Sequence, residues 1–198
     1  MNVHSEGGIF NLMDKKALIL RSTLKLITEN GFHATPVSLI ASDSGVAAGT
    51  IYRYFKNKDD IINELYAYVK KDFNDAILKG MEEGISEKDE YALKWKNMIN
   101  YFIKNQCEAK FMDQYATSPF INKEIVKSSL ARYSHLRDLY NRASASGIIR
   151  DVSYEAVMVS MLGTVNQLYR TNNSQMFNID EKVINEVFEV FWNGIKKY

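Results

Sequence analysis

The chain has 198 residues, of which 46% are hydrophobic and 25% are charged, an ordinary balance for a globular protein. A chain of this length forms one domain, or one small domain joined to a larger one. The formal net charge is only +1. This value excludes a protein whose whole surface binds polyanions, but it allows a locally basic region.

Several classes of site are excluded by the residues that are scarce. Cys107 is the single cysteine, so the sequence offers no disulfide framework. The three histidines lack metal-ligand spacing, and we expect no metal site and no cofactor. No apolar run approaches the roughly 18 residues that span a membrane, so we expect no membrane partner. Residues 1–12 show no signal-peptide pattern and are predicted to be a flexible tail of a cytoplasmic protein.

Helical periodicity dominates the rest of the chain. Apolar residues recur at spacings of three and four, alternation at period two is not sustained, and the chain has only two prolines. The predicted fold class is therefore all-α. Thr35 is expected to cap a helix that Pro36 starts, and Gly84 to follow the end of a long helix. The predicted helices end at Asn30 or cover 36–44, 47–54, 58–83, 87–107, 108–117, 121–146, 153–171 and 180–197.

Charge divides the chain into two parts. Residues 13–58 carry seven basic and three acidic side chains, whereas residues from 59 onward carry 18 basic and 20 acidic ones. A basic module joined to a slightly acidic one is typical of a nucleic-acid-binding domain coupled to another function. We therefore predict a flexible tail at 1–12, a basic nucleic-acid-binding module at 13–58 and a larger helical part with another function at 59–198.

The most informative segment is 35–65, TPVSLIASDSGVAAGTIYRYFKNKDDIINEL. Its first two predicted helices are separated by a turn at Gly45, which is helix-turn-helix spacing. Val46, Ile51 and Phe55 fall on the inner side of the second helix and are expected to pack on the preceding helices. Small residues at the start of this helix leave its outer side free to enter a DNA major groove.

This segment resembles the TetR family of transcriptional regulators. The pattern covers about residues 17–65 and consists of Gly31-Phe32, Thr35, Ile40-Ala41, Gly45-Val46, Gly49-Thr50-Ile51-Tyr52, Tyr54-Phe55 and Lys58. The resemblance implies a three-helix DNA-binding domain at 13–58, joined by a long helix to a C-terminal helical regulatory domain at 59–198 for ligand binding and dimerisation. It also implies a homodimer that binds a pseudo-palindromic double-stranded operator and is released by a small-molecule effector. We expect a repressor, although these residues do not distinguish a repressor from an activator.

The resemblance also assigns DNA contacts. Ala47 and Ala48 depart from the family, in which many members have Ser or Thr at the first position and a polar residue at the second. Ala47 cannot cap the helix, which should cost about 1 kcal/mol of local stability, and Ala48 offers only an apolar contact, for example to a thymine methyl. The candidate DNA-binding residues are Thr35, Ala48, Thr50, Tyr52, Arg53, Tyr54 and Lys58, with phosphate contacts expected at Thr35, Thr50, Tyr52 and Lys58.

Aromatic and methionine side chains recur at helical spacing in the regulatory half. Such stripes are more often plain core than a ligand site, but the family's effector cavity opens in this half, so both interpretations stay open. No convergent cluster of charges accompanies them, which favours a mainly apolar or aromatic effector. The candidate ligand-binding residues are Trp95, Met98, Phe102, Tyr115, Tyr133 and Tyr140.

The last two predicted helices, 153–171 and 180–197, are apolar on almost every side. A helix that is apolar all round must be covered on all faces. A partner chain is the natural cover and would give a four-helix, two-fold interface, although packing within the same domain is the alternative. The candidate interface residues are Ser160, Gly163, Thr164, Val187, Phe188 and Phe191.

Two other functions compete with DNA-binding regulation. One is an all-α enzyme or small-molecule carrier in which the helix-turn-helix likeness is incidental, and the other is a helical protein-binding dimer without DNA affinity. No nucleophile–base pair, glycine-rich phosphate loop or paired carboxylates form a recognisable motif. We therefore assign no catalytic residue and expect no enzymatic activity.

Overall fold

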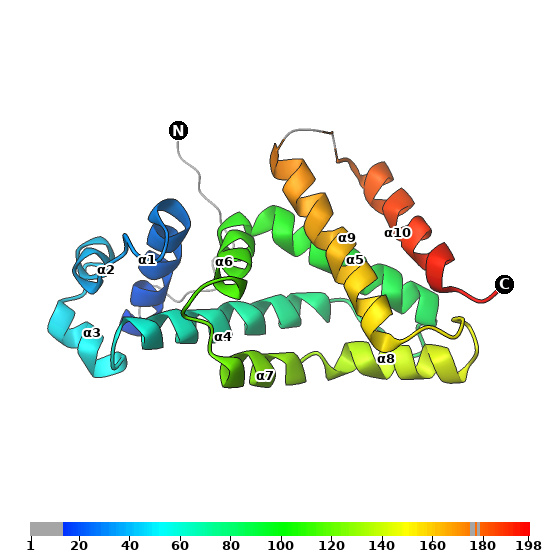
Figure 1. Cartoon of the computed structure of the whole chain (residues 1–198), viewed down its shortest axis with the longest axis horizontal. Helices are drawn as coiled ribbons and strands as arrows, with labels where there is room; N and C mark the ends of the chain where they lie inside the picture. The colour runs from blue at the N-terminus through cyan, green and yellow to red at the C-terminus, as the bar shows by residue number, and fades with distance from the viewer. Residues whose placement is uncertain (1–13, 175–176, 178) are drawn as a thin grey trace. The chain divides into compact units, whose positions relative to one another are not determined.

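The computed structural model describes residues 14–174, 177 and 179–198, and the predicted tail at 1–12 lies outside them. The described residues form ten helices, together with an isolated antiparallel bridge between Ile149 and Lys196, which confirms the all-α prediction (Figure 1). The helices are α1 (Lys15–Asn30), α2 (Val37–Ser44), α3 (Ala48–Tyr54), α4 (Lys58–Ile77), α5 (Glu87–Lys104), α6 (Gln106–Ala116), α7 (Lys123–Ala131), α8 (Ser134–Ala145), α9 (Tyr154–Ser174) and α10 (Glu181–Ile195). Among them, no helix is both long enough and apolar enough to cross a membrane.

The packing divides the chain into two compact units. The N-terminal unit contains the chain up to Asp72 together with Gln106–Ser129, and the C-terminal unit contains Phe73–Asn105 and Leu130–Tyr198. Helix α4 therefore begins in the first unit and ends in the second. This division differs from the predicted domains at 13–58 and 59–198, because α6 and most of α7 pack with the N-terminal helices.

In the N-terminal unit, α1 is the central element and packs against α2, α3 and α6. Val46, Ile51 and Phe55 are buried in the same core cluster as Ile27 of α1, as predicted from their inner positions. Phe111 of α6 belongs to this cluster as well. The helix-turn-helix and the helix after α5 consequently share one core.

The N-terminal ends of α2 and α3 lack side-chain caps. The N-cap of α2 is Pro36 rather than the predicted Thr35, because the Thr35 hydroxyl donates to the Gly31 carbonyl oxygen at 2.8 Å instead. At the start of α3, Ala47 occupies the N-cap position with φ −54° and ψ 139° and makes no side-chain hydrogen bond. The predicted absence of a cap on this helix is thus confirmed.

Helix α4 ends at Ile77, six residues before the predicted end at 83. The side chain of Asn97 in α5 donates to the carbonyl oxygens of Ile77 at 3.0 Å and Lys79 at 2.8 Å. Gly80 then takes φ +76°, a conformation that favours glycine and ends the turn. A tertiary cap and Gly80, rather than Gly84, therefore terminate this helix.

The single helix predicted at 121–146 is two helices, α7 and α8. Tyr133 lies between them with φ −92° and ψ 19°, and its ring is buried within 6.3 Å of the Phe73 ring. The chain breaks here without a glycine or proline, so no residue type signals the interruption. The other predicted helices between 87 and 197 end within three residues of the observed bounds.

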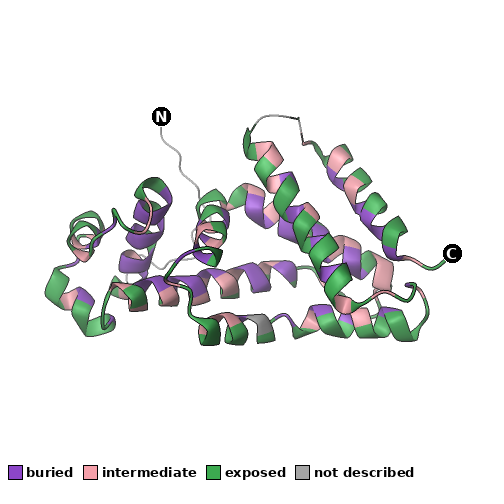
Figure 2. Cartoon of the chain, viewed as in Figure 1, coloured by how far each residue is buried: buried purple, intermediate pink, exposed green. Residues whose placement is uncertain are grey.

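In the C-terminal unit, α5 packs against α8, α9 and α10, and α9 packs against α10. Aromatic rings fill the space around α5. The Trp95 ring stacks on Phe191 at 5.6 Å, and the Phe73 ring stacks on Phe102 at 5.0 Å. Figure 2 shows the buried residues on the inner side of these helices and exposed residues along the length of α9.

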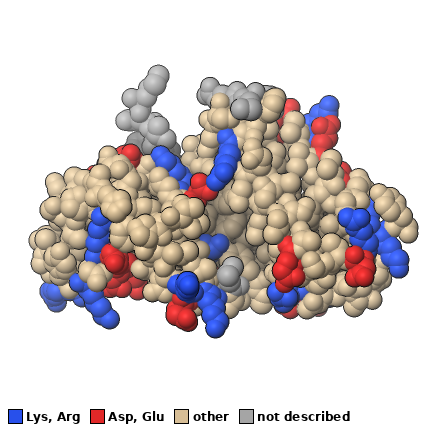
Figure 3. Space-filling model, viewed as in Figure 1, with Lys and Arg blue, Asp and Glu red and all other residues tan. Residues whose placement is uncertain are grey.

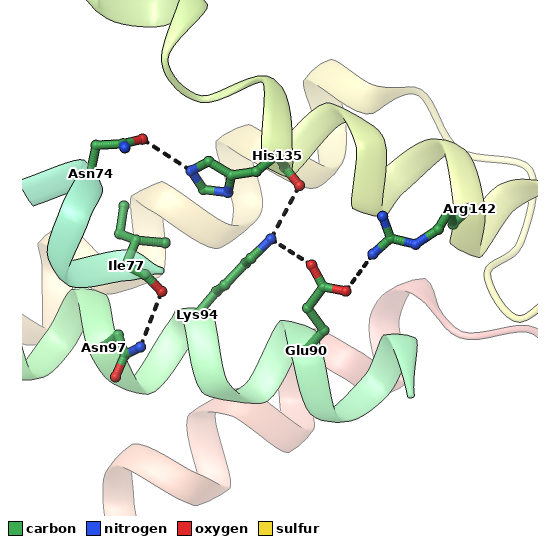
Figure 4. Close-up of polar contacts among 7 residues, drawn as sticks. All are labelled: Asn74, Ile77, Glu90, Lys94, Asn97, His135 and Arg142. Atoms are coloured by element: carbon green, nitrogen blue, oxygen red, sulfur yellow. Dashed lines mark hydrogen bonds and ion pairs between the residues drawn. The ribbon is translucent and has the colours of Figure 1, made fainter. Parts of the chain in front are cut away.

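The same unit holds a buried ion pair of Glu90 and Lys94 with the exposed Arg142 at its edge, which Figure 4 shows between α5 and α8. Lys94 is only 1% exposed, and its Nζ donates to Glu90 Oε1 at 2.6 Å and to the His135 carbonyl oxygen at 3.1 Å. Arg142 Nη2 pairs with the other oxygen of Glu90. The side chain of His135 contacts α4, with its Nε2 atom 3.1 Å from Asn74 Oδ1. Burial, assisted by the charge of Lys94, lowers the pKa of His135 to about 4. The imidazole is therefore neutral near pH 7.

Replacing Glu90 by Gln should destabilise the protein strongly. The substitution keeps the shape of the side chain but leaves the buried Lys94 ammonium without its counter-charge, which costs about 3–5 kcal/mol. Chemical denaturation measures the change in the free energy of unfolding. The control is Glu186→Gln, whose partner Lys182 lies 3.7 Å away on the surface, and it should cost less than about 1 kcal/mol. Equal, small effects of both substitutions would contradict this account.

Replacing Ala47 by Ser should stabilise α3. The backbone of Ala47 already has N-cap geometry, and a hydroxyl there can accept from an unpaired amide of the first turn, adding about 1 kcal/mol. Equilibrium unfolding together with amide hydrogen exchange in α3 tests the gain. Ala48→Ser, one residue further on and inside the helix, is the matched control, and an equal effect of both would rule out capping as the cause.

Candidate nucleic-acid interface

The turn between α2 and α3 places the second helix of the motif on the surface. Gly45 adopts φ +66° and ψ 15° at the end of α2, and the Ser44 hydroxyl accepts from the Val46 amide at 3.3 Å. Ile51 and Phe55 are then buried beneath α3. The opposite side of α3 has no covering element among the described residues of this unit, as its exposed side chains indicate.

Most predicted DNA contacts lie on that open side. Ala48 and Arg53 are exposed, and Thr50 is half-buried. The Tyr52 and Tyr54 side chains are 55% and 46% exposed, unusually high for large aromatic residues. The structure thus brings these five residues together on a single short helix, next to the exposed Ala47 and Gly49 at its start.

Thr35 and Lys58 are placed differently. Thr35 is completely buried, and its hydroxyl donates to Gly31 O, so this side chain cannot reach a phosphate in this conformation. Lys58 is half-buried at the start of α4, where its ammonium donates to the Phe32 carbonyl oxygen. Burial lowers the pKa of the Lys58 ammonium below its usual value.

The charges around this surface are partly paired. Lys16 Nζ lies 2.8 Å from Glu64, and Lys25 Nζ lies 2.6 Å from Asp43. The hydrogen bond from Lys25 holds the pKa of Asp43 below its usual range. On the face drawn in Figure 3, basic side chains project from the region of α3 and the start of α4, with acidic side chains beside them.

The predicted ligand-binding residues do not form one group. Tyr115 lies in the N-terminal unit, where its ring stacks on Tyr66 at 4.0 Å and its hydroxyl donates to Asn63 Oδ1 at 2.6 Å. The other five lie in the C-terminal unit and are buried, apart from Tyr140, which is half-buried and donates to the Val152 carbonyl oxygen at 2.8 Å. These five are Trp95, Met98, Phe102, Tyr133 and Tyr140.

The sequence analysis did not predict two features of the C-terminal unit. One is the charge cluster of Glu90, Lys94 and Arg142, which corrects the expectation that charges do not converge in this half. The spacing of Glu90 and Lys94 signals their pairing, but nothing signals Arg142, 52 residues away. The other is a groove of about 550 Å³ lined by Thr164, Gln167, Leu168, Thr171, Phe177, Ile179, Val183 and Val187.

The predicted interface residues divide into exposed and buried sets. Ser160 and Gly163 are exposed on α9, and Thr164 and Val187 are half-buried. Phe188 and Phe191 instead fill the core of their own chain, with ring centroids 5.9 and 5.6 Å from that of Trp95. The large apolar side chains left exposed on these helices include Val159 at 74% and Val190 at 73%.

The described residues contain no group of three or more His, Cys, Asp or Glu side chains arranged to hold a metal ion.

Two family models match the chain. The model described as "Bacterial regulatory proteins, tetR family" matches residues 19–65, and the model described as "Tetracyclin repressor-like, C-terminal domain" matches residues 87–196. The first covers the helix-turn-helix, and the second covers more than half of the chain.

Individual relatives agree with these matches. An uncharacterized HTH-type transcriptional regulator of Haemophilus influenzae is 26% identical over 181 residues, which are 90% of this chain and 94% of that protein. A TetR-family regulator from Marinobacter aquaeolei has the same fold, with a TM-score of 0.86 at 20% identity, covering 93% of this chain and 96% of that one. The transcriptional regulator FadR from Bacillus subtilis, solved in complex with stearoyl-CoA, has a TM-score of 0.76 at 26% identity and covers 90% and 98%. The chain belongs to the TetR family of DNA-binding transcriptional regulators.

Proposed function

We propose that this regulator is a homodimeric repressor that binds a pseudo-palindromic operator and leaves it when a small effector binds. The observation that carries the DNA-binding mode is the exposed outer side of α3, held by Val46, Ile51 and Phe55 in the core of the N-terminal unit. Two such helices, one from each protomer, fit successive major grooves when they lie about 34–36 Å apart. A repressor of this kind acts on the chromosome, which places it in the cytoplasm.

The contacts we propose follow from exposure and chemistry. Arg53 and Tyr54 reach base edges or phosphates, Thr50 and Tyr52 bind phosphates, and Ala48 allows close approach to a thymine methyl. Lys58 supplies a further phosphate contact at the start of α4. The proposal leaves out Thr35, because its buried hydroxyl is already used within the protein. The DNA-binding function is assigned to residues 13–58 and regulation to 59–198, with α6 and α7 packed on the DNA-binding part.

Operator binding should depend strongly on salt. If each protomer makes about 4–6 phosphate contacts, the slope of log affinity against log salt for the dimer is about −7 to −11. If Arg53 binds a guanine, Arg53→Ala should reduce the difference in binding free energy between operator and random DNA by about 1–3 kcal/mol per site. Fluorescence anisotropy on an operator selected from a random library, and on random duplex, measures both quantities.

The control for this prediction is Arg150→Ala, which removes an exposed arginine from the C-terminal unit. It should leave both the salt slope and the discrimination unchanged. Affinity that is independent of salt would refute DNA binding by this surface. An equal loss on operator and random DNA for Arg53→Ala would restrict Arg53 to a phosphate contact.

We propose that the dimer interface is the exposed side of α9 and α10. Val159 and Val190 are largely exposed there, and Ser160 and Gly163 are small enough to let two helices approach closely. Thr164 and Val187 line the groove between these helices, and we place the partner's helices against it. Phe188 and Phe191 support this surface from inside their own chain.

Val159→Asp and Val190→Asp should each dissociate the dimer. Both side chains are exposed in the single chain, so the variants should fold, but the interface would bury an unpaired carboxylate twice because of the two-fold symmetry. Sedimentation velocity should show a dissociation constant raised by about 100-fold or more. Leu78→Asp, at a partly exposed apolar residue outside these helices, is the control. An unchanged dimer in both valine variants would move the interface elsewhere.

The effector we propose is mainly apolar or aromatic and binds in the C-terminal unit. Its candidate contacts are the aromatic and methionine side chains around α5, namely Trp95, Met98, Phe102, Tyr133 and Tyr140. The complex of the Bacillus subtilis relative with stearoyl-CoA supports a ligand with a long apolar part. Tyr115 is left out, because it lies in the core of the N-terminal unit with its hydroxyl bonded to Asn63.

A further inference from the structure

The turn between α6 and α7 brings an aromatic ring to the end of α1. The centroid of the Phe120 ring lies 5.2 Å from that of Phe32 and 6.1 Å from that of His33, the residues that follow α1. The Lys58 ammonium lies 5.7 Å from the centroid of the same Phe120 ring. All four residues belong to the N-terminal unit, although Phe120 is 62 residues beyond Lys58 in the chain.

The turn that carries Phe120 is fixed by hydrogen bonds. The Phe120 amide donates to the Ser118 hydroxyl at 3.3 Å, and that hydroxyl donates to the Tyr115 carbonyl oxygen at 2.9 Å. The Asn122 amide donates to the Tyr115 hydroxyl at 3.0 Å, and this hydroxyl donates to Asn63 of α4. Phe120 is therefore held in place relative to α4, the helix that Lys58 begins.

Lys58 is accordingly in contact with two groups of its own chain, unlike a lysine that extends into solvent. One of its three N–H groups is donated to the Phe32 carbonyl oxygen, and the face of Phe120 covers another side. The ammonium keeps donors for a further acceptor. Part of its hydration is already lost, as its lowered pKa indicates. An anion that binds there meets a charge whose orientation and desolvation costs are largely met by the protein.

We propose that Phe120, which lies outside the helix-turn-helix, is a positioning residue that holds Lys58 for its contact with a DNA phosphate. The inference rests on the proposed phosphate contact of Lys58. It makes the α6–α7 turn part of the DNA-binding surface, because the ring orders the cation without touching DNA. A lysine freed from the ring would lose orientation entropy when it binds, and every DNA sequence would be bound less tightly by the same factor.

The test is a double-mutant cycle on DNA affinity. Phe120→Leu removes the ring but keeps an apolar side chain, Phe120→Tyr keeps the ring, and Lys58→Met removes the charge. Affinities are measured by fluorescence anisotropy at fixed salt on a random duplex of about 30 base pairs and on a selected operator. Loss of the cation–ring interaction should weaken binding about two- to fivefold per protomer, or about 4- to 25-fold for the dimer.

Four results are expected together. Phe120→Leu weakens binding to operator and random DNA by the same factor, whereas Phe120→Tyr binds both as tightly as the unmodified protein. In the Lys58→Met background, Phe120→Leu has no further effect on affinity. Thermal unfolding should show that the Phe120→Leu variant is folded. The cycle separates positioning from structure, because a general disturbance of the fold would persist in the Lys58→Met background and would reduce operator discrimination.

Other results would overturn the inference. An undiminished effect of Phe120→Leu in the Lys58→Met background would show that the ring does not act through Lys58. Tighter binding by Phe120→Leu would mean that the ring withholds the lysine from DNA. If the Lys58→Met variant binds DNA as tightly as the unmodified protein, the proposed phosphate contact is wrong. If Lys58→Met weakens binding but Phe120→Leu does not, only the positioning role of Phe120 is refuted.

Discussion

The burial of Val46, Ile51 and Phe55 against α1 is the interaction on which the proposed DNA-binding surface depends. Helix α3 has only seven residues, and a helix of that length is not stable alone in water. It also lacks a side-chain cap, so local interactions contribute little. Its inner residues must therefore supply the stability, which leaves the outer positions free for the proposed contacts with DNA. The scaffold and the proposed recognition surface thus lie on opposite sides of one short helix.

The C-terminal unit uses a different means of fixing its elements. Helix α4 ends where Asn97 donates to the carbonyl oxygens of Ile77, its last residue, and Lys79 just beyond it, and Asn74, near that end, faces His135 of α8. His135 in turn accepts, through its backbone, a hydrogen bond from the buried Lys94. Directional polar contacts, unlike apolar ones, specify one register of the helices. The end of the helix that starts at Lys58 is consequently set by hydrogen bonds from two other helices.

The sequence predicts the local parts of this structure well and the tertiary parts less well. The helix-turn-helix is predictable because Gly45 and the apolar spacing of Ile51 and Phe55 act within a few residues. The end of α4 cannot be predicted in this way, because it depends on Asn97, which lies 20 residues further along the chain than Ile77. The break at Tyr133 has no glycine or proline, and the packing of α6 on α1 leaves no periodic signal. Phe188 was predicted at a dimer interface but packs against Trp95 of its own chain. An apolar side chain on a helix can be buried in its own core or against a partner, and the sequence does not distinguish the two.

The same limit applies to the candidate site. The outer positions of α3 follow from helical geometry alone, and the structure exposes all of them except Thr50, which is half-buried. Thr35 has the residue type of a cap or a phosphate ligand, but a carbonyl of the preceding turn takes its hydroxyl. Residue type thus predicts what a side chain can bond to, and only the fold decides which partner is nearest.

The uncapped beginning of α3 has a thermal consequence. Its first turn consists of Ala48, Gly49 and Thr50 after Ala47, with the two alanines and the glycine exposed. Glycine and an unfilled N-cap favour fraying of this turn in the free protein. If α3 binds DNA as proposed, ordering of this turn becomes part of the binding step, which is favourable in enthalpy and unfavourable in entropy. The affinity for DNA would then decrease more steeply on warming than it would with a capped and preformed helix.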